Sequence, residues 1–236
     1  MKSILIAACM FLSMQMLNAH ALWIEAKTVG KVGQAVEVKI YYGEYASNER
    51  EDISKWYSDV KDFSLWLTAP GKEKIKLATM AGSNFYQTSF TPENEGLYIL
   101  TVSHEAKELG GTTKYTFSSV ATVNVGKTSV VDQSSLPNSL KVAVNEAKIY
   151  KVNAPVNLKA VIDGKPWANK NVSVFTPEGW SKEFKTDENG NIAFKPIWPG
   201  RYVLEVSNYE KTSGEHNGKK YEAVWQGATS SFEVTE

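Results

Sequence analysis

Two segments of the chain, FTPENEGLYILTVS from Phe90 to Ser103 and FKPIWPGRYVLEVS from Phe194 to Ser207, repeat one pattern in the same register. The shared pattern is F-x-P-x-x-x-G-x-Y-[IV]-L-x-V-S. It predicts a loop that ends in glycine, a tyrosine that caps the edge of a core, and a strand that buries alternate residues, as at the tyrosine corner of a β-sandwich. The repetition indicates a duplicated domain.

Short runs of alternating apolar residues occur elsewhere in both halves of the chain. They include Val36, Val38, Ile40; Phe63, Leu65, Leu67; and Val156, Leu158, Ala160, Ile162. Such alternation, with turns rich in glycine, proline and asparagine between the runs, predicts antiparallel strands with one buried face. Residues 187–190 and 216–219 contain Asn-Gly, which hairpin turns favour. Only residues 48–60 suggest a short helix, so the sequence predicts an all-β protein.

The predicted organisation is two immunoglobulin-like β-sandwich domains in tandem. We expect an N-terminal sandwich over residues 20–126, a linker over 127–138 and a C-terminal sandwich over 139–236. The linker is placed there because Val125 to Ser139 is rich in serine, glycine and asparagine and contains Pro137. A chain of 236 residues is long enough for two such domains.

The first 19 residues have the parts of a secretory signal peptide. Lys2 is followed by the apolar stretch SILIAACMFLSMQML and then by small or polar residues. The lone cysteine, Cys9, lies within this segment, and too little apolar sequence precedes it for a lipoprotein signal. No other segment approaches the roughly 18 apolar residues of a spanning helix. We expect an exported, periplasmic protein with no membrane span of its own.

The composition excludes several classes of function. The 26 basic and 26 acidic residues balance, with no long run of one sign to bind nucleic acid. There is no G-x-S-x-G motif and no glycine-rich phosphate loop. The acidic residues Glu49, Glu51 and Asp52 are expected to form a solvated loop. The sequence therefore predicts a binding protein, not an enzyme.

The three histidines, His20, His104 and His216, are the candidate metal ligands. Imidazole nitrogen suits nickel or cobalt, and also copper or zinc, better than calcium or magnesium. If the signal is cut after Ala19, His20 is the first residue of the mature chain and its α-amine and Nδ1 can chelate one ion. A cut after Ala21 satisfies the small-x-small rule better and discards His20.

Two other interpretations of the sequence remain. Exposed tryptophans, with Trp198 the best candidate, would allow a module without metal to bind a glycan or an envelope protein. A copper oxidase with a histidine brace would need His20 and His104 within a few ångströms of each other.

The opening His20-Ala-Leu-Trp23-Ile-Glu25 is similar to the H-x-F-W-L-E opening of exported bacterial proteins grouped as a domain of unknown function. That family is often described as a nickel-uptake substrate-specific region. The second half also resembles the family, in its G-x-P, T-D-x-x-G and P-G-x-[WY] sequences at residues 164–166, 186–190 and 199–202.

The resemblance implies a periplasmic protein that binds nickel or cobalt and presents the ion to inner-membrane components of an energy-coupling-factor transporter. It also favours cleavage after Ala19, because His20 then stands at the head of the motif. Ala21 and Ala26 differ from the acid and the proline that are common in the family at these positions.

Overall fold

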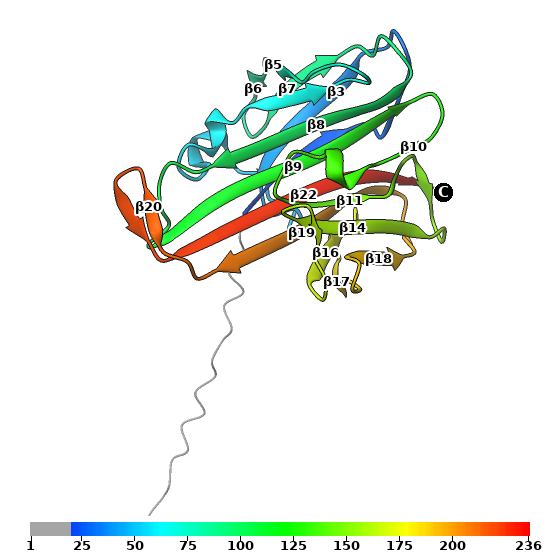
Figure 1. Ribbon diagram of the computed structural model, residues 1–236. Helices are drawn as coiled ribbons and strands as arrows, with labels where there is room; N and C mark the ends of the chain where they lie inside the picture. Colours follow the sequence, from blue (N-terminus) through cyan, green and yellow to red (C-terminus); the bar gives the residue numbers. More distant parts are fainter. Residues whose placement is uncertain (1–19) are drawn as a thin grey trace, which may run out of the picture.

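The structure is a computed structural model that describes residues 20–236. The predicted signal peptide, with Cys9, lies outside the described residues. Within them the chain is almost entirely β-strand, which confirms the all-β prediction (Figure 1). Where the sequence suggested a short helix, the structure has two single turns of 3₁₀-helix, η1 (Ile53–Lys55) and η2 (Val60–Asp62).

The largest sheet runs through both halves of the chain. Its strand order is β17-β16-β19-β22-β9-β8-β4-β5, with the short strands β13 and β2 added beside β22 and β9. The strands are β2 (Val29–Gly30), β4 (Leu65–Thr68), β5 (Ile75–Leu77), β8 (Gly96–Glu105), β9 (Thr113–Val125), β13 (Tyr150–Lys151), β16 (Asn171–Phe175), β17 (Ser181–Lys185), β19 (Gly200–Glu210) and β22 (Ala223–Thr235).

This order is symmetric about the central pair, β9 and β22, which lie side by side in the middle of the molecule (Figure 1). The two strands run parallel, from Ala223 opposite Thr113 to Ser231 opposite Ala121. Outward from this pair, β8 and β19 carry the two copies of the repeated pattern. The duplication read from the sequence is therefore built into one continuous sheet.

Each half has a second sheet of its own. In the first half it has the order β1-β3-β7-β6, and in the second β11-β14-β15 with β18 also paired to β14. The strands are β1 (Ala21–Ala26), β3 (Val36–Gly43), β6 (Met80–Ala81), β7 (Tyr86–Phe90), β11 (Leu140–Val144), β14 (Val156–Ile162), β15 (Lys165–Pro166) and β18 (Asn191–Phe194).

The second sheets cover opposite faces of the shared sheet. Ser119 of β9 directs its hydroxyl at β1, whereas its neighbour Val120 packs with Ala143 of β11. Successive side chains of a strand point to opposite faces, so β1 and β11 lie on opposite sides of β9. Each half accordingly has its own main core, one around Leu22, Ile40 and Leu100 and the other around Leu158, Leu204 and Phe232.

Small hydroxyl side chains hold β1 against the central strands. The Ile24 amide donates to the Ser119 hydroxyl at 3.1 Å, and the Thr229 hydroxyl donates to the Leu22 carbonyl at 2.7 Å. The Ser231 hydroxyl donates to the Ile24 carbonyl at 2.9 Å. These bonds satisfy backbone groups on the edge of β1 that does not pair with β3, where an unpaired buried group would be costly. They fix the position of β1 and of the residue before it, His20.

The repeated pattern forms two tyrosine corners, as predicted. The Tyr98 hydroxyl donates to the Asn94 carbonyl at 2.9 Å and accepts from the Asn94 amide at 3.1 Å. Tyr202 makes the same two bonds with Trp198, at 3.1 and 3.2 Å. The glycines two residues earlier, Gly96 and Gly200, have φ values of 132° and 129°, which residues other than glycine rarely adopt.

The two Asn-Gly turns differ from each other. Residues 216–219 join β20 (Gly214–His216) to β21 (Lys219–Tyr221) in the expected hairpin. Residues 187–190 form a turn, but the hairpin prediction there is wrong. The flanking strands pair elsewhere, β17 with β16 and β18 with β14, because the turn passes from the shared sheet to the second sheet of the C-terminal half.

The segment predicted as a linker, residues 127–138, packs against the shared sheet. It contains β10 (Ser129–Val130), which pairs with β12 (Glu146–Ala147), and the 3₁₀ turn η3 (Gln133–Ser135). Val131 and Leu136 are buried in a small cluster with Val120. The Asn138 amide donates to the Val102 carbonyl at 3.2 Å. This segment therefore connects the two cores through buried contacts.

The hydroxyl contacts between β1 and the central strands predict a stability effect. Thr229→Val keeps the shape of the side chain but leaves the buried Leu22 carbonyl without its donor, so we expect the free energy of unfolding to fall by about 1–3 kcal/mol. Urea denaturation measures this. Thr91→Val, at an exposed position, is the control, and equal stability of the two variants would contradict the role assigned to Thr229.

Candidate functional site

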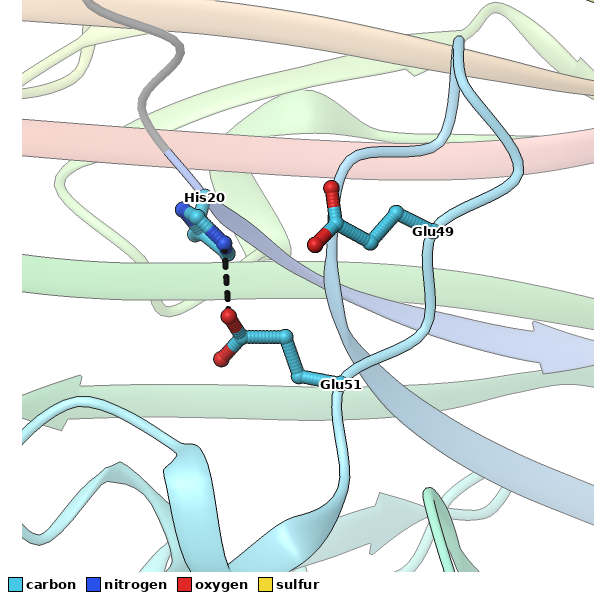
Figure 2. A group of neighbouring side chains, drawn as sticks. All are labelled: His20, Glu49 and Glu51. Carbon is cyan, nitrogen blue, oxygen red and sulfur yellow. Dashed lines mark ion pairs between the residues drawn. The ribbon is translucent and has the colours of Figure 1, made fainter.

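His20 lies directly before β1, at the end of the first sandwich, and faces the loop that follows β3 (Figure 2). Its Nε2 is 2.9 Å from Glu51 Oε1, and its Nδ1 is 4.0 Å from Glu44 Oε1. The imidazole ring stacks on Tyr42 with a centroid distance of 5.4 Å. The ring is thus held between a core aromatic residue and two carboxylates.

The loop that carries the carboxylates folds back on itself. The Glu44 amide donates to the Glu49 carbonyl, and the Glu49 amide donates to the Glu44 carbonyl, at 3.1 and 2.9 Å. Gly43 has a φ of 146°, and a Cβ there would lie 2.5 Å from the Glu49 carbonyl oxygen. Only glycine permits this close approach. The loop therefore brings Glu49 and Glu51 toward His20 with a defined backbone.

His20, Glu49 and Glu51 form a group whose ligand atoms all lie within 4.8 Å of one another. His20 Nε2 and Glu44 Oε1 are buried and make no hydrogen bond; the contact of Nε2 with Glu51 is an ion-pair contact outside hydrogen-bond geometry. Buried polar atoms are normally satisfied. One imidazole nitrogen and two carboxylates at this spacing are donors that a divalent transition-metal ion accepts.

Trp23 and Glu25 of the opening motif hold the loop in place through Arg50. Arg50, between the two candidate carboxylate ligands, lies 3.4 Å from Glu25 Oε1. Its guanidinium is 5.5 Å from the Trp23 ring centroid and 4.9 Å from that of Tyr41. Residues of β1 alternate in direction. Trp23 and Glu25 point away from the core that His20 faces, and they hold the loop from its other side.

The C-terminal half also anchors this loop. The Tyr45 hydroxyl donates to the Arg201 carbonyl of β19 at 3.0 Å, and the Tyr45 ring packs against Phe175 of β16. Trp23, Tyr41 and Val203 form a buried cluster between the halves at the same place. Both halves therefore contribute to the position of the candidate ligands.

Glu44 beside His20, and Glu205 next to Glu44, hold their protons more tightly than usual. Burial raises the pKa of Glu44, against the opposing effect of His20. Burial, with the nearby charge of Glu44, raises the pKa of Glu205 on β19 to about 8.

An aromatic pocket of about 160 Å³ adjoins His20. Its lining is Tyr42, Tyr57, Gly110, Tyr115, Phe117 and Trp225 together with His20. Trp225 comes from β22 and the other aromatic residues come from the first half, so the pocket lies beside the central strand pair. One side of the imidazole therefore faces a hollow lined by aromatic side chains.

His104 and His216 lie in other surroundings. His104 Nε2 is 3.1 Å from Asp59 Oδ1, and its side chain is 14% exposed. Burial raises the pKa of Asp59, but the Lys107 amide and His104 outweigh it and hold that pKa below its usual value. His216 Nε2 is 2.9 Å from the Ala106 carbonyl oxygen, and its Nδ1 is 3.3 Å from Glu105.

Within residues 20–236, the ligand cluster of His20 contains carboxylates and neither of the other histidines. Of the acids predicted to form a solvated loop, Glu49 and Asp52 are exposed, but the Glu51 side chain is only 18% exposed. No local pattern marked these glutamates, because their approach to His20 depends on the pairing of β1 with β3 and on the turn at Gly43.

The chain belongs to a family of unknown function, Domain of unknown function (DUF4198), whose model matches residues 17–210. No curated protein matches this chain. Among solved structures, it is similar to Salmonella alpha-2-macroglobulin reacted with methylamine, with 11% identity, a TM-score of 0.28, and coverage of 91% of this chain and 15% of that one.

The BSP domain of a biofilm-associated protein is matched with 12% identity and a TM-score of 0.25, over 91% of this chain and 30% of that one. A two-domain fibronectin type III segment of chicken tenascin is matched with 10% identity and a TM-score of 0.25, over 86% and 95% of the two chains. The chain thus spans less than a third of the length of the first two.

The raised pKa of Glu205 predicts a pH-dependent stability. A carboxyl group whose pKa is higher in the folded than in the unfolded state stabilises the fold at low pH, and this contribution is lost as pH rises from about 4.5 to about 8. Relative to the unmodified protein, Glu205→Gln should therefore gain at least about 1 kcal/mol between pH 5 and pH 8. Urea denaturation at both pH values tests this, with the exposed Glu188→Gln as control; a pH-independent difference would contradict it.

Proposed function

We propose that this protein binds a transition-metal ion, nickel or cobalt first and copper or zinc next, through His20, Glu51 and Glu49. The observation that carries the proposal is the buried Nε2 of His20, which makes no hydrogen bond and belongs to a group of ligand atoms within 4.8 Å of one another. A metal ion in this group would satisfy the nitrogen and neutralise the adjacent carboxylates.

The mixed set of donors refines the sequence prediction of a site built from three histidines. Imidazole suits the later transition metals, and the two carboxylates would supply harder oxygen donors to the same ion. Cleavage after Ala19 would add the α-amine of His20 as a further nitrogen donor. Glu25, through Arg50, would act as a positioning residue that keeps Glu49 and Glu51 on the side of the ring.

We further propose that the bound ion is cargo, which the protein carries in the periplasm to an inner-membrane uptake system. Support comes from the signal-like residues 1–19 and from the resemblance of the opening motif to proteins described as nickel-uptake components. Among the described residues, no helix is long and apolar enough to cross a membrane. The aromatic pocket beside His20 would leave a route by which the ion could enter and leave.

Calorimetric titration of the exported protein with Ni²⁺ and Co²⁺ tests the site. We expect one ion per chain, and His20→Ala, Glu51→Gln and Glu49→Gln should each weaken binding at least about tenfold, a loss of 1.4 kcal/mol or more. Mass spectrometry of the same sample determines whether His20 is the first residue.

Three control variants separate this cluster from other acids and histidines. Asp52→Asn changes an exposed acid in the same loop, and His104→Ala and His216→Ala remove the other two candidates. All three should bind with unchanged affinity. A loss in His104→Ala as large as that in His20→Ala would favour the copper histidine brace, and no effect of His20→Ala would refute the proposed site.

Metal affinity should fall as the pH is lowered. Protons compete with the ion for the imidazole nitrogen, and for the α-amine if His20 is the first residue, so binding releases protons. Titrations at pH 8, 7 and 6 in two buffers of different ionisation enthalpy measure both effects. Affinity that is constant over this range would indicate that carboxylates alone bind the ion.

A further inference from the structure

The C-terminal half contains a mostly apolar pocket of about 380 Å³ that is separate from the His20 cluster. It opens between β17 and β18, which the 187–190 turn connects but which pair with different sheets. The sandwich is therefore open at this edge. Phe184 and Phe194 contact each other with a centroid distance of 5.3 Å, and both line the pocket together with Val174 and Tyr202.

Large apolar side chains form the rim of this pocket and are exposed to solvent. Trp180 is 66% exposed and Ile197 is 59% exposed. Trp180 and Trp198 contact each other with a centroid distance of 5.7 Å. The backbone of Trp198 is bonded to the Tyr202 hydroxyl, and the Trp180 amide is bonded to the Thr176 hydroxyl, so both walls are preformed. The sequence analysis favoured Trp198 as the exposed tryptophan; Trp180 is the more exposed of the pair.

The first half shows that the fold does not require apolar residues at this rim. In the register of the repeated pattern, Ile197 and Trp198 correspond to Glu93 and Asn94. There Glu93 pairs with Lys72, which lies in the turn between β4 and β5, the counterpart of the turn that carries Trp180. One copy of the loop is thus closed by an ion pair, and the other presents exposed tryptophan and isoleucine. Exposed apolar groups gathered in a concave site mark a binding surface.

The charges at the opening indicate what kind of molecule fits. Lys182 and Lys195 line the pocket, and no acidic residue does. The Lys182 ammonium lies 5.1 Å from the Phe184 ring centroid, at the mouth of the pocket. The Thr176 hydroxyl accepts a bond from the Trp180 amide, and Ser181 is the other hydroxyl in the lining. The lining is otherwise mainly apolar, which suits an aliphatic chain better than the many hydroxyl groups of a glycan.

We propose that this pocket binds a small amphipathic anion of the fatty-acid type. The apolar tail would lie against Trp180 and Trp198 and along the two phenylalanines, and the carboxylate would contact Lys182 and Lys195. A volume of about 380 Å³ is within the range of small-molecule sites. This proposal does not depend on the metal site, because the two share no residue.

Decanoate is the probe for the test. We expect calorimetry to show binding of one decanoate, and the indole N–H resonances of Trp180 and Trp198 to shift in nuclear magnetic resonance spectra. Trp180→Ala should weaken binding about tenfold. Changing Lys182 and Lys195 together to glutamine should weaken decanoate binding but leave binding of the uncharged 1-decanol unchanged. Tyr209→Ala, at an exposed aromatic residue outside the pocket, is the control and should bind normally.

Each of three other results would overturn the proposal. Decanoate binding that is absent, or is unaffected by Trp180→Ala, removes the fatty-acid ligand. Binding of cellotetraose in place of decanoate assigns the pocket to a glycan. A concentration-dependent dimer in sedimentation experiments that disappears in Trp180→Ala assigns it to a second copy of this chain.

Discussion

The arrangement of the molecule depends on the parallel pairing of β9 with β22. Nine consecutive residues of β22 lie opposite β9, and the pair is covered on both faces. Serine, threonine and alanine predominate where the two strands pass beneath β1, as at Ser119, Ala121, Thr229 and Ser231. Side chains of this size let a covering strand approach closely, and their hydroxyl groups satisfy its backbone. A larger apolar residue at these positions would separate β1 from the central strands and leave its polar groups unpaired.

This pairing also decides where the two halves can cooperate. The loop with Glu49 and Glu51 belongs to the first half, but Tyr45 at its start is bonded to Arg201 of the second. Glu205 of the second half is close enough to Glu44 for the Glu44 charge to raise the pKa of Glu205. The loop of the proposed metal cluster is therefore electrostatically coupled, through Glu44, to a strand of the other half. That coupling would be absent if the halves were two sandwiches joined only by a flexible segment.

The two copies of the repeated unit keep their framework and differ at their open ends. Both have the tyrosine corner, the left-handed glycine and a proline packed beneath it, Pro70 under Gly96 and Pro177 under Gly200. The first copy closes its loop with Lys72 and Glu93, and the second exposes Trp180 and Ile197. Because the framework is stable with either set, the side chains at these ends are available for function. The apolar pocket of the second copy therefore lies at a position where the two copies differ.

The sequence by itself determined the all-β class, the duplication and the two tyrosine corners, because alternation of apolar residues and the F-x-P-x-x-x-G-x-Y pattern act over a few neighbouring residues. It also pointed to His20 and to the opening motif of the family. Only the tertiary structure decided what His20 meets, since Glu49 and Glu51 reach it through the register of β1 on β3 and the turn at Gly43. The turn at residues 187–190 could be predicted from the local sequence. Whether it joins paired strands or passes between sheets depends on strands far away in the chain. Local preferences set the shape of each segment, and long-range pairing set which side chains come together.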